Sequence, residues 1–273
     1  MKKILKIFIL LFILVSLVGC QDEWQPNLIT DINNLEGRKV GVNLSWEADY
    51  ALTGRTDLEL CRYDTTADLI MALSYNKVDA IAVDGLTWNM LKNCSTGLIK
   101  VDPEVKKTGY ILYFAEEELK DEFNDYLIEF KKTEKYEDLI QRESNYEGEY
   151  FGPDIKLTGT GKTIKVAYEP LCYPKAFLNP GESVPTGFDL EALKYFANEE
   201  NYQLDFTATS YDDGVMGLFD GKYDAMAGYL AEEYAATARY YGLFTSEAID
   251  EMPIYFVQKT QEKITVDIEK LED

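Results

Sequence analysis

Apolar and polar positions follow two repeating patterns along the chain, which predict strands and helices in turn. A period of two predicts strands, and a period near 3.6 predicts helices. The expected strands cover residues 39–44, 58–63, 78–83, 110–114, 163–167, 203–208, 223–227 and 251–259. The expected helices begin near residue 46 and cover residues 66–75, 88–92, 117–142 (one helix or two), 188–198 and 215–219. Strands alternating with helices predict the α/β class, with layers built on mainly parallel sheets.

The regular pattern lapses between residues 145 and 162, where glycine, tyrosine and threonine replace it. This stretch is the best candidate for a linker between an α/β region at 31–144 and another at 163–273. A short phrase recurs once in each region, as Asn76-Lys77-Val78-Asp79-Ala80 and Gly221-Lys222-Tyr223-Asp224-Ala225. Residues 264–273 also resemble residues 28–37, so the globular part ends on nearly the phrase with which it begins.

The first residues have the pattern of an export signal. Lysines at positions 2, 3 and 6 precede an apolar and small-residue run at 7–19, which is shorter than the roughly 20 residues that span a bilayer. The run ends in Leu17-Val18-Gly19-Cys20, which resembles the lipobox of bacterial lipoproteins. The resemblance implies a signal peptide at 1–19, lipid on Cys20, a tether at 20–30, and a location outside the cytoplasm on a bacterial membrane. The alternatives are an uncleaved anchor or an ordinary signal peptide with an incidental cysteine.

Composition limits the partners and the chemistry. The chain has 27 basic and 49 acidic residues, a net charge of −22, which argues against nucleic acid or anionic lipid as partners. It has no histidine, which excludes Ser-His-Asp and Cys-His catalysis and most catalytic zinc sites. No metal site or cofactor is expected. Beyond Cys20, the three widely spaced cysteines form no disulfide framework; Cys61 and Cys94 could pair or remain free thiols, and Cys172 is left over.

Several motifs resemble the family-3 extracellular solute-binding proteins, the amino-acid-binding components of ABC transporters. Motifs typical of the family's first lobe are Ile164-Lys165-Val166-Ala167, Tyr173-Pro174-Lys175-Ala176-Phe177, Gly187-Phe188-Asp189-Leu190, the Gly221–Ala225 phrase, and Arg239 five residues before Phe244-Thr245. Motifs typical of its second lobe are Leu35-Glu36-Gly37-Arg38-Lys39-Val40-Gly41-Val42, Asp84 and the helix at 118–124. The resemblance implies a periplasmic-binding-protein type II fold, a monomer that binds a small molecule, and an ABC permease as a possible partner.

These motifs stand in an unusual order. The second lobe and the closing helices of the family come first here, and its first lobe follows. A circular permutation would produce this order, with residues 145–162 joining the old ends. The alternative is a truncated tandem array of two incomplete domains.

The expected ligand site lies beyond the carboxyl ends of strands, where open α/β sheets bind ligands. Residues at such ends are Ser45, Trp46, Asp84, Glu169 and Tyr229. By family resemblance Arg239 would hold a ligand carboxylate, which suits its forked guanidinium, and Asp84 would hold an amine.

Each assignment has a structural alternative. Tyr173, Phe177 and Trp46 would form apolar walls, but such aromatic residues are often core. Arg239 could pair with Glu232 or Glu233, and Asp84 could cap a helix. Glu47 and Asp49 are expected to be solvated.

Lobe closure on a ligand would be the mechanism. Two other functions stay open: a sensor or adhesion lipoprotein without a transport role, and an enzyme on the same fold, although no catalytic residue stands out.

Overall fold

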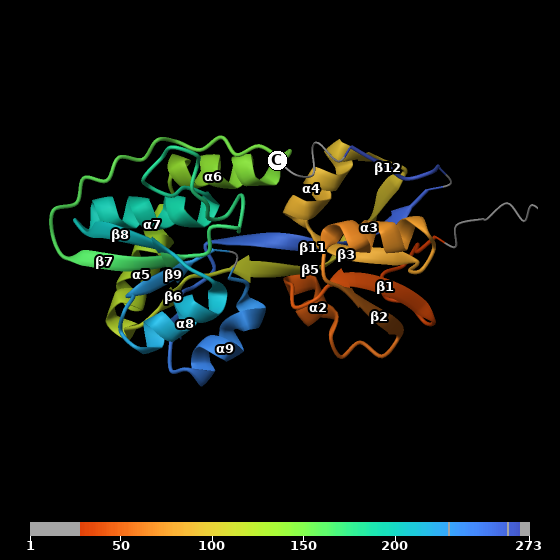
Figure 1. Cartoon of the computed structure of the whole chain (residues 1–273), viewed down its shortest axis with the longest axis horizontal. Helices are drawn as coiled ribbons and strands as arrows, with labels where there is room; N and C mark the ends of the chain where they lie inside the picture. The colour runs from red at the N-terminus through yellow and green to blue at the C-terminus, as the bar shows by residue number, and fades with distance from the viewer. Residues whose placement is uncertain (1–27, 229, 261, 268–273) are drawn as a thin grey trace, which may run out of the picture.

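The computed structural model describes residues 28–228, 230–260 and 262–267 (Figure 1). The expected signal peptide at 1–19 and Cys20 lie outside the described residues, as does most of the expected tether. No helix in the described ranges is long and apolar enough to cross a bilayer. The described residues form two α/β lobes, which we name the N-lobe and the C-lobe, each built on a five-stranded sheet.

The N-lobe sheet has the strand order β2-β1-β3-β11-β5. β1 pairs in parallel with β2 and β3, whereas β11 pairs antiparallel with β3 and β5. A two-stranded ribbon of β4 and β12 lies beside this sheet. The elements of the N-lobe are β1 (Arg38–Asn43), α2 (Glu47–Leu52), β2 (Leu58–Tyr63), α3 (Thr66–Ser74), β3 (Ala80–Asp84), α4 (Gly85–Cys94), β4 (Ser95–Thr96), β5 (Leu98–Tyr110), β11 (Asp250–Lys259) and β12 (Thr265–Val266).

The C-lobe sheet has the strand order β10-β6-β9-β7-β8. β7 is parallel to β8 and β9, and β6 is antiparallel to β9 and β10. The elements of the C-lobe are β6 (Tyr113–Phe114), α5 (Glu117–Phe130), α6 (Glu134–Ser144), β7 (Thr163–Tyr168), α7 (Phe188–Glu199), β8 (Gln203–Ala208), α8 (Tyr211–Phe219), β9 (Ala225–Ala227), the 3₁₀ turn η1 (Glu232–Tyr234), α9 (Ala235–Tyr240) and β10 (Phe244–Thr245).

The predicted α/β class is confirmed, because the described residues form two lobes in which helices accompany a five-stranded sheet. The prediction of mainly parallel sheets is wrong in part, because each sheet has a parallel half and an antiparallel half. The chain passes from one lobe to the other twice, between β5 and β6 and between β10 and β11, and these four strands form the antiparallel halves. The strand predicted at 110–114 is in fact divided: β5 ends at Tyr110 in the N-lobe sheet, and β6 begins at Tyr113 in the C-lobe sheet.

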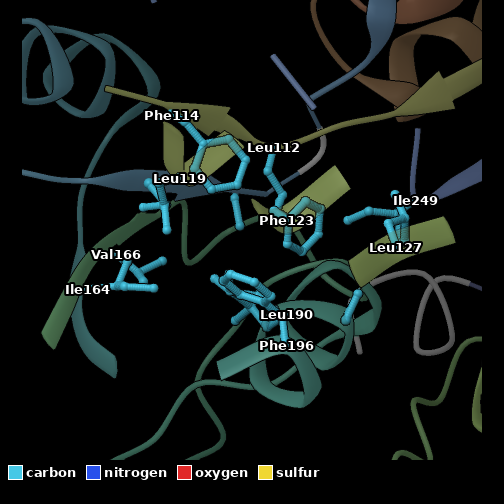
Figure 2. Close-up of a cluster of buried hydrophobic side chains, with 14 of the residues drawn as sticks. Leu112, Phe114, Leu119, Phe123, Leu127, Ile164, Val166, Leu190, Phe196 and Ile249 are labelled. Carbon is cyan, nitrogen blue, oxygen red and sulfur yellow. The ribbon is translucent and has the colours of Figure 1, made fainter. Parts of the chain in front are cut away.

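The core of the C-lobe joins helices from either side of the 145–162 segment (Figure 2). Phe123 of α5 is fully buried, with ring centroids 5.5 Å from Phe114 and 5.3 Å from Phe196 of α7. Val166 and Leu190 line the same cluster. Residues 117–130 and 188–199 therefore form one hydrophobic core, although the chain between them is long.

Two chain segments cross between the lobes, and they run side by side. Ile249 N donates to the Tyr110 carbonyl at 2.7 Å, and Ser246 N donates to the Leu112 carbonyl at 2.9 Å. The Ser246 hydroxyl accepts from Leu112 N at 2.9 Å. A hydrogen-bonded pair of strands can bend as a unit, so this crossing has the geometry of a hinge.

A fully buried lysine lies beside this crossing. Lys175 Nζ is 2.5 Å from Asp250 Oδ2 at the start of β11, 3.6 Å from Asp189 Oδ1, and also bonds Glu143 of α6. The Tyr110 ring centroid is 4.0 Å from the same ammonium. Burial lowers the pKa of Lys175, but the attraction of Asp250 and Glu143 outweighs it and raises that pKa overall. The ammonium thus fixes α6, α7 and both crossing strands to one another.

The two regions of the chain should stay associated when the peptide chain is cut within residues 145–162. Phe151, Gly152, Pro153 and Asp154 are exposed, whereas the flanking regions share both sheets. We expect a chain cut at a protease site inserted between Gly152 and Pro153 to remain one folded particle on size-exclusion chromatography. Separation of the two fragments under native conditions would contradict this. The same insertion between the buried Ile111 and Leu112 serves as a control and should prevent folding.

Candidate functional site

A cavity of about 690 Å³ lies between the two lobes. Its size is within the range of small-molecule sites. The carboxyl ends of four parallel strands meet there: Ser45 and Trp46 follow β1, Thr87 follows β3, Glu169 follows β7, and Gly228 follows β9. The cavity therefore occupies the place where open α/β sheets bind ligands. The described lining residues are Leu44, Ser45, Trp46, Glu47, Tyr50, Thr66, Leu86, Thr87, Met90, Tyr146, Gly148, Glu169, Leu171, Cys172, Tyr173, Pro174, Tyr211, Gly228, Tyr234 and Thr237.

Four of the predicted site residues line this cavity, namely Ser45, Trp46, Glu169 and Tyr173. Ser45 has a φ of +62°, which turns the chain from β1 into α2. Trp46 is the residue that precedes the first turn of α2. Tyr229 lies outside the described residues.

Asp84 does not line the cavity, but it hydrogen-bonds Thr87, which does. Its side chain is 1% exposed and caps α4: Oδ1 accepts from Thr87 N at 2.9 Å, and Oδ2 accepts from the Thr87 hydroxyl at 2.7 Å. The helix-cap alternative therefore describes the position of Asp84, and Thr87 is the residue of this pair that reaches the cavity.

Arg239 and Phe177 are not brought into the cavity. Arg239 lies on α9 with an exposed side chain, and Thr237, two residues earlier, lines the wall instead. The helix turns about 100° per residue, so the faces of these two positions differ. Glu233, a candidate partner for Arg239, bonds Lys106 and Thr108 instead. Phe177 is buried behind the wall, 4.5 Å from Tyr173 between ring centroids.

Glu47 and Asp49, expected to be solvated, are in fact buried. Asp49 Oδ2 accepts from Ser45 N at 3.0 Å and Oδ1 pairs with Arg62 at 2.9 Å, which fixes the turn after β1. Glu47 faces the cavity and hydrogen-bonds Asp84. Burial, followed by the nearby Asp84 charge, raises the pKa of Glu47 well above its ordinary value. The carboxyl of Glu47 therefore holds its proton to a higher pH than a solvated glutamate does.

The lobes touch at both edges of the cavity. On one side the Tyr234 hydroxyl of η1 donates to the Ser45 carbonyl at 3.0 Å, and the Tyr50 and Tyr234 rings meet at 5.1 Å in an edge-to-face pair. On the other side Asn89 Nδ2 of α4 donates to the Ser144 carbonyl of α6 at 3.0 Å. These weak polar contacts are of the kind that lobe opening can break and remake.

The described cysteines offer little nucleophilic chemistry. Cys61 and Cys94 are not joined by a disulfide bond. Cys172 lines the cavity, but burial, followed by the nearby Glu169 charge, raises the pKa of its thiol far above the ordinary value. A thiol that keeps its proton is a poor nucleophile.

The cavity carboxyl gives a pH prediction. Since the folded-state pKa of Glu47 is raised, its contribution to stability is fully present below about pH 4.5 and is lost as the pH rises through the folded-state pKa. Glu47→Gln keeps a donor for Asp84 but does not titrate. We expect the variant to gain stability relative to the wild type between pH 4.5 and pH 8, measured by urea unfolding. The exposed Glu36→Gln is the control and should follow the wild type at both pH values.

Comparison with protein-family models and with curated proteins gives no match. Solved structures resemble the chain loosely. The periplasmic VFT2 domain of BvgS from Bordetella pertussis is 12% identical with a TM-score of 0.39, over 88% of this chain and 87% of that one. A P235GK mutant of ArgBP from T. maritima is 16% identical with a TM-score of 0.36, over 88% and 87%. A phosphate-binding protein of a phosphate ABC transporter from Streptococcus pneumoniae is 10% identical with a TM-score of 0.41, over 83% and 90%.

Proposed function

We propose that this protein is a lipid-anchored, extracytoplasmic solute-binding protein that captures a small polar solute between its two lobes. The observation that carries the proposal is the cavity of about 690 Å³ at the convergence of four strand ends, next to a paired-strand crossing. A ligand that contacts both walls at once favours the closed arrangement of the lobes and so shifts their equilibrium. An amino acid is the solute that the family resemblance implies, and an ABC permease is the partner that would read closure.

A binding role is proposed over catalysis because of the groups present in the wall. The chain has no histidine, and the pKa of the Cys172 thiol is raised. The acidic wall residues Glu47 and Glu169 both have raised pKa values, for which burial is the largest cause. Glu169 lies beside the Cys172 thiol, but burial raises the pKa of that thiol, so the two do not form the activated nucleophile–base pair that an acyl-transfer enzyme of this kind would need.

We propose the domain division 31–144 and 163–273, joined by 145–162, with circular permutation as its origin. Support comes from the route of the chain. After β1–β5 of the N-lobe, the chain crosses to the C-lobe for β6, α5 and α6. It then passes through 145–162, completes the C-lobe with β7–β10, and returns to the N-lobe as β11. Each lobe is complete only with a strand from the other region, so the parts form one set of lobes.

The binding proposal is tested by a thermal-shift screen of amino acids, amines and other small polar solutes. We expect at least one to raise the melting temperature, and small-angle scattering to show a more compact particle with it. Trp46→Ala together with Tyr173→Ala should abolish the shift. If no solute stabilises the chain, or if the double variant still responds in full, the proposal is wrong.

The anchor is tested separately. Cys20→Ser should release the protein from membranes of an expressing bacterium, and mass spectrometry should find lipid on the wild type alone. A wild-type protein found in the soluble fraction with an unmodified Cys20 would contradict the anchor and leave the binding proposal standing.

A further inference from the structure

The wall of the cavity is acidic. Glu47 and Glu169 line it, and the described lining residues include no lysine or arginine. Arg239, the candidate partner for a carboxylate, lies on α9 with an exposed side chain and does not line the cavity. The carboxylate of an amino acid would therefore enter without a cationic partner, and burying an unpaired charge is costly.

The wall is also aromatic on both lobes. Trp46 and Tyr50 come from the N-lobe, and the described rings from the C-lobe are Tyr146, Tyr173, Tyr211 and Tyr234. They form clusters: Tyr234 lies 5.1 Å from Tyr50 and 6.4 Å from Tyr211, and Tyr146 lies 6.2 Å from Tyr173, between ring centroids. The faces of such rings attract cations, and several rings around one space are suited to an ammonium group.

Glu169 supplies a fixed counter-charge at the end of β7. Within the described part of the chain, no lysine or arginine lies within 4.0 Å of its carboxylate. The side chain is half-buried, and burial is the largest cause of its raised pKa. A cation placed in the cavity would stabilise the ionised form of this group, so the site gains by binding one.

We propose that the ligand is a small organic ammonium ion without a carboxylate, held between the aromatic walls of the two lobes and paired with Glu169. This inference rests on the proposed solute-binding function, and it replaces the amino acid that the family resemblance implies with a cation that has no carboxylate. The N-lobe contributes Trp46 and Tyr50, and the C-lobe contributes Glu169 and the remaining tyrosines, so the cation bridges the lobes in the closed form.

The test uses three probes of nearly one shape: choline, a cation; glycine betaine, a zwitterion with the same ammonium; and 3,3-dimethylbutan-1-ol, the neutral isostere of choline. Ethanolamine and glycine repeat the first comparison with a primary amine. By calorimetry we expect each cation to bind about tenfold or more tightly than its zwitterionic or neutral counterpart. Tighter binding of betaine or glycine, or equal binding of the neutral isostere, would overturn the inference and leave the solute-binding function intact.

Variants separate the site from the overall acidity of the chain. Glu169→Gln should weaken cation binding about tenfold and leave the neutral isostere unchanged. Glu182→Gln removes one exposed carboxylate of the same lobe outside the cavity and should leave cation binding unchanged. An equal loss in both variants would show non-specific attraction by net charge. If no cation binds while another solute raises the melting temperature, this inference fails alone; if no solute binds, the proposed function fails with it.

Discussion

Lys175→Met is expected to destabilise the folded protein by about 3–5 kcal/mol, as removal of one partner from a buried ion pair does. The ammonium is fully buried and is shared by Glu143, Asp189 and Asp250, which come from three different elements. Methionine fills much of the same volume but leaves these carboxyl groups without their cation. Urea unfolding at pH 7 measures the loss, and partial separation of the crossing strands should appear as faster hydrogen exchange at residues 110 and 249–250.

Two further variants test whether the loss of stability in Lys175→Met comes from the buried ion pairs. Lys156→Met removes an exposed ion pair with Asp154 and should leave the unfolding midpoint unchanged. Lys175→Met combined with Asp250→Asn should be less damaging than the sum of the single changes, because the second change removes a charge that the first leaves unpaired. A cost below about 1 kcal/mol for Lys175→Met would show that water reaches the cluster.

Phe123→Ala should cost about 3–5 kcal/mol, the usual range for a large-to-small change in a packed core. The ring is fully buried between β6 and α7, with the Phe114 and Phe196 rings on either side (Figure 2). Since α5 precedes the 145–162 segment and α7 follows it, the substitution should weaken the association between the two regions of the chain. In the chain cut between Gly152 and Pro153, the variant should therefore separate into fragments at lower urea than the cut wild type.

The matched control for Phe123 lies on the same helix. Ile128 is 56% exposed, and its replacement by alanine, a better helix former, should change stability by no more than about 0.5 kcal/mol. An equal loss for both variants would place the effect in the helix itself and contradict a role for the shared core.

Local pattern predicted most of the elements because most of them bury one face against a sheet. The helix at 188–198 and the strands at 58–63 and 203–208 lie within a residue of their predicted bounds. The pattern does not predict β5, because charged residues such as Lys100, Asp102 and Lys106 lie along a strand at the sheet edge, where an apolar alternation is not required. The division at residues 111–112 has no local signal, since both sides of it are buried.

The site is harder to predict from the sequence, because the residues that line the cavity come from segments that only the tertiary fold brings together. Ser45, Trp46 and Glu169 could be found from strand ends alone. Tyr146 and Tyr234 could not, since they come from a helix end and a 3₁₀ turn with no strand before them. Family spacing indicates Arg239 as a site residue, but the position of α9 relative to the cavity depends on tertiary packing that spacing does not determine.

The N-lobe holds both outermost described segments of the chain. Ile29 N donates to Gln258 Oε1 of β11 at 2.7 Å, and β12 pairs with β4. With lipid on Cys20, the membrane would therefore hold the N-lobe in place, and the attachment would not involve the paired crossing strands. The C-lobe would then be the lobe that moves when a ligand binds, and a protein in the same membrane could detect that movement.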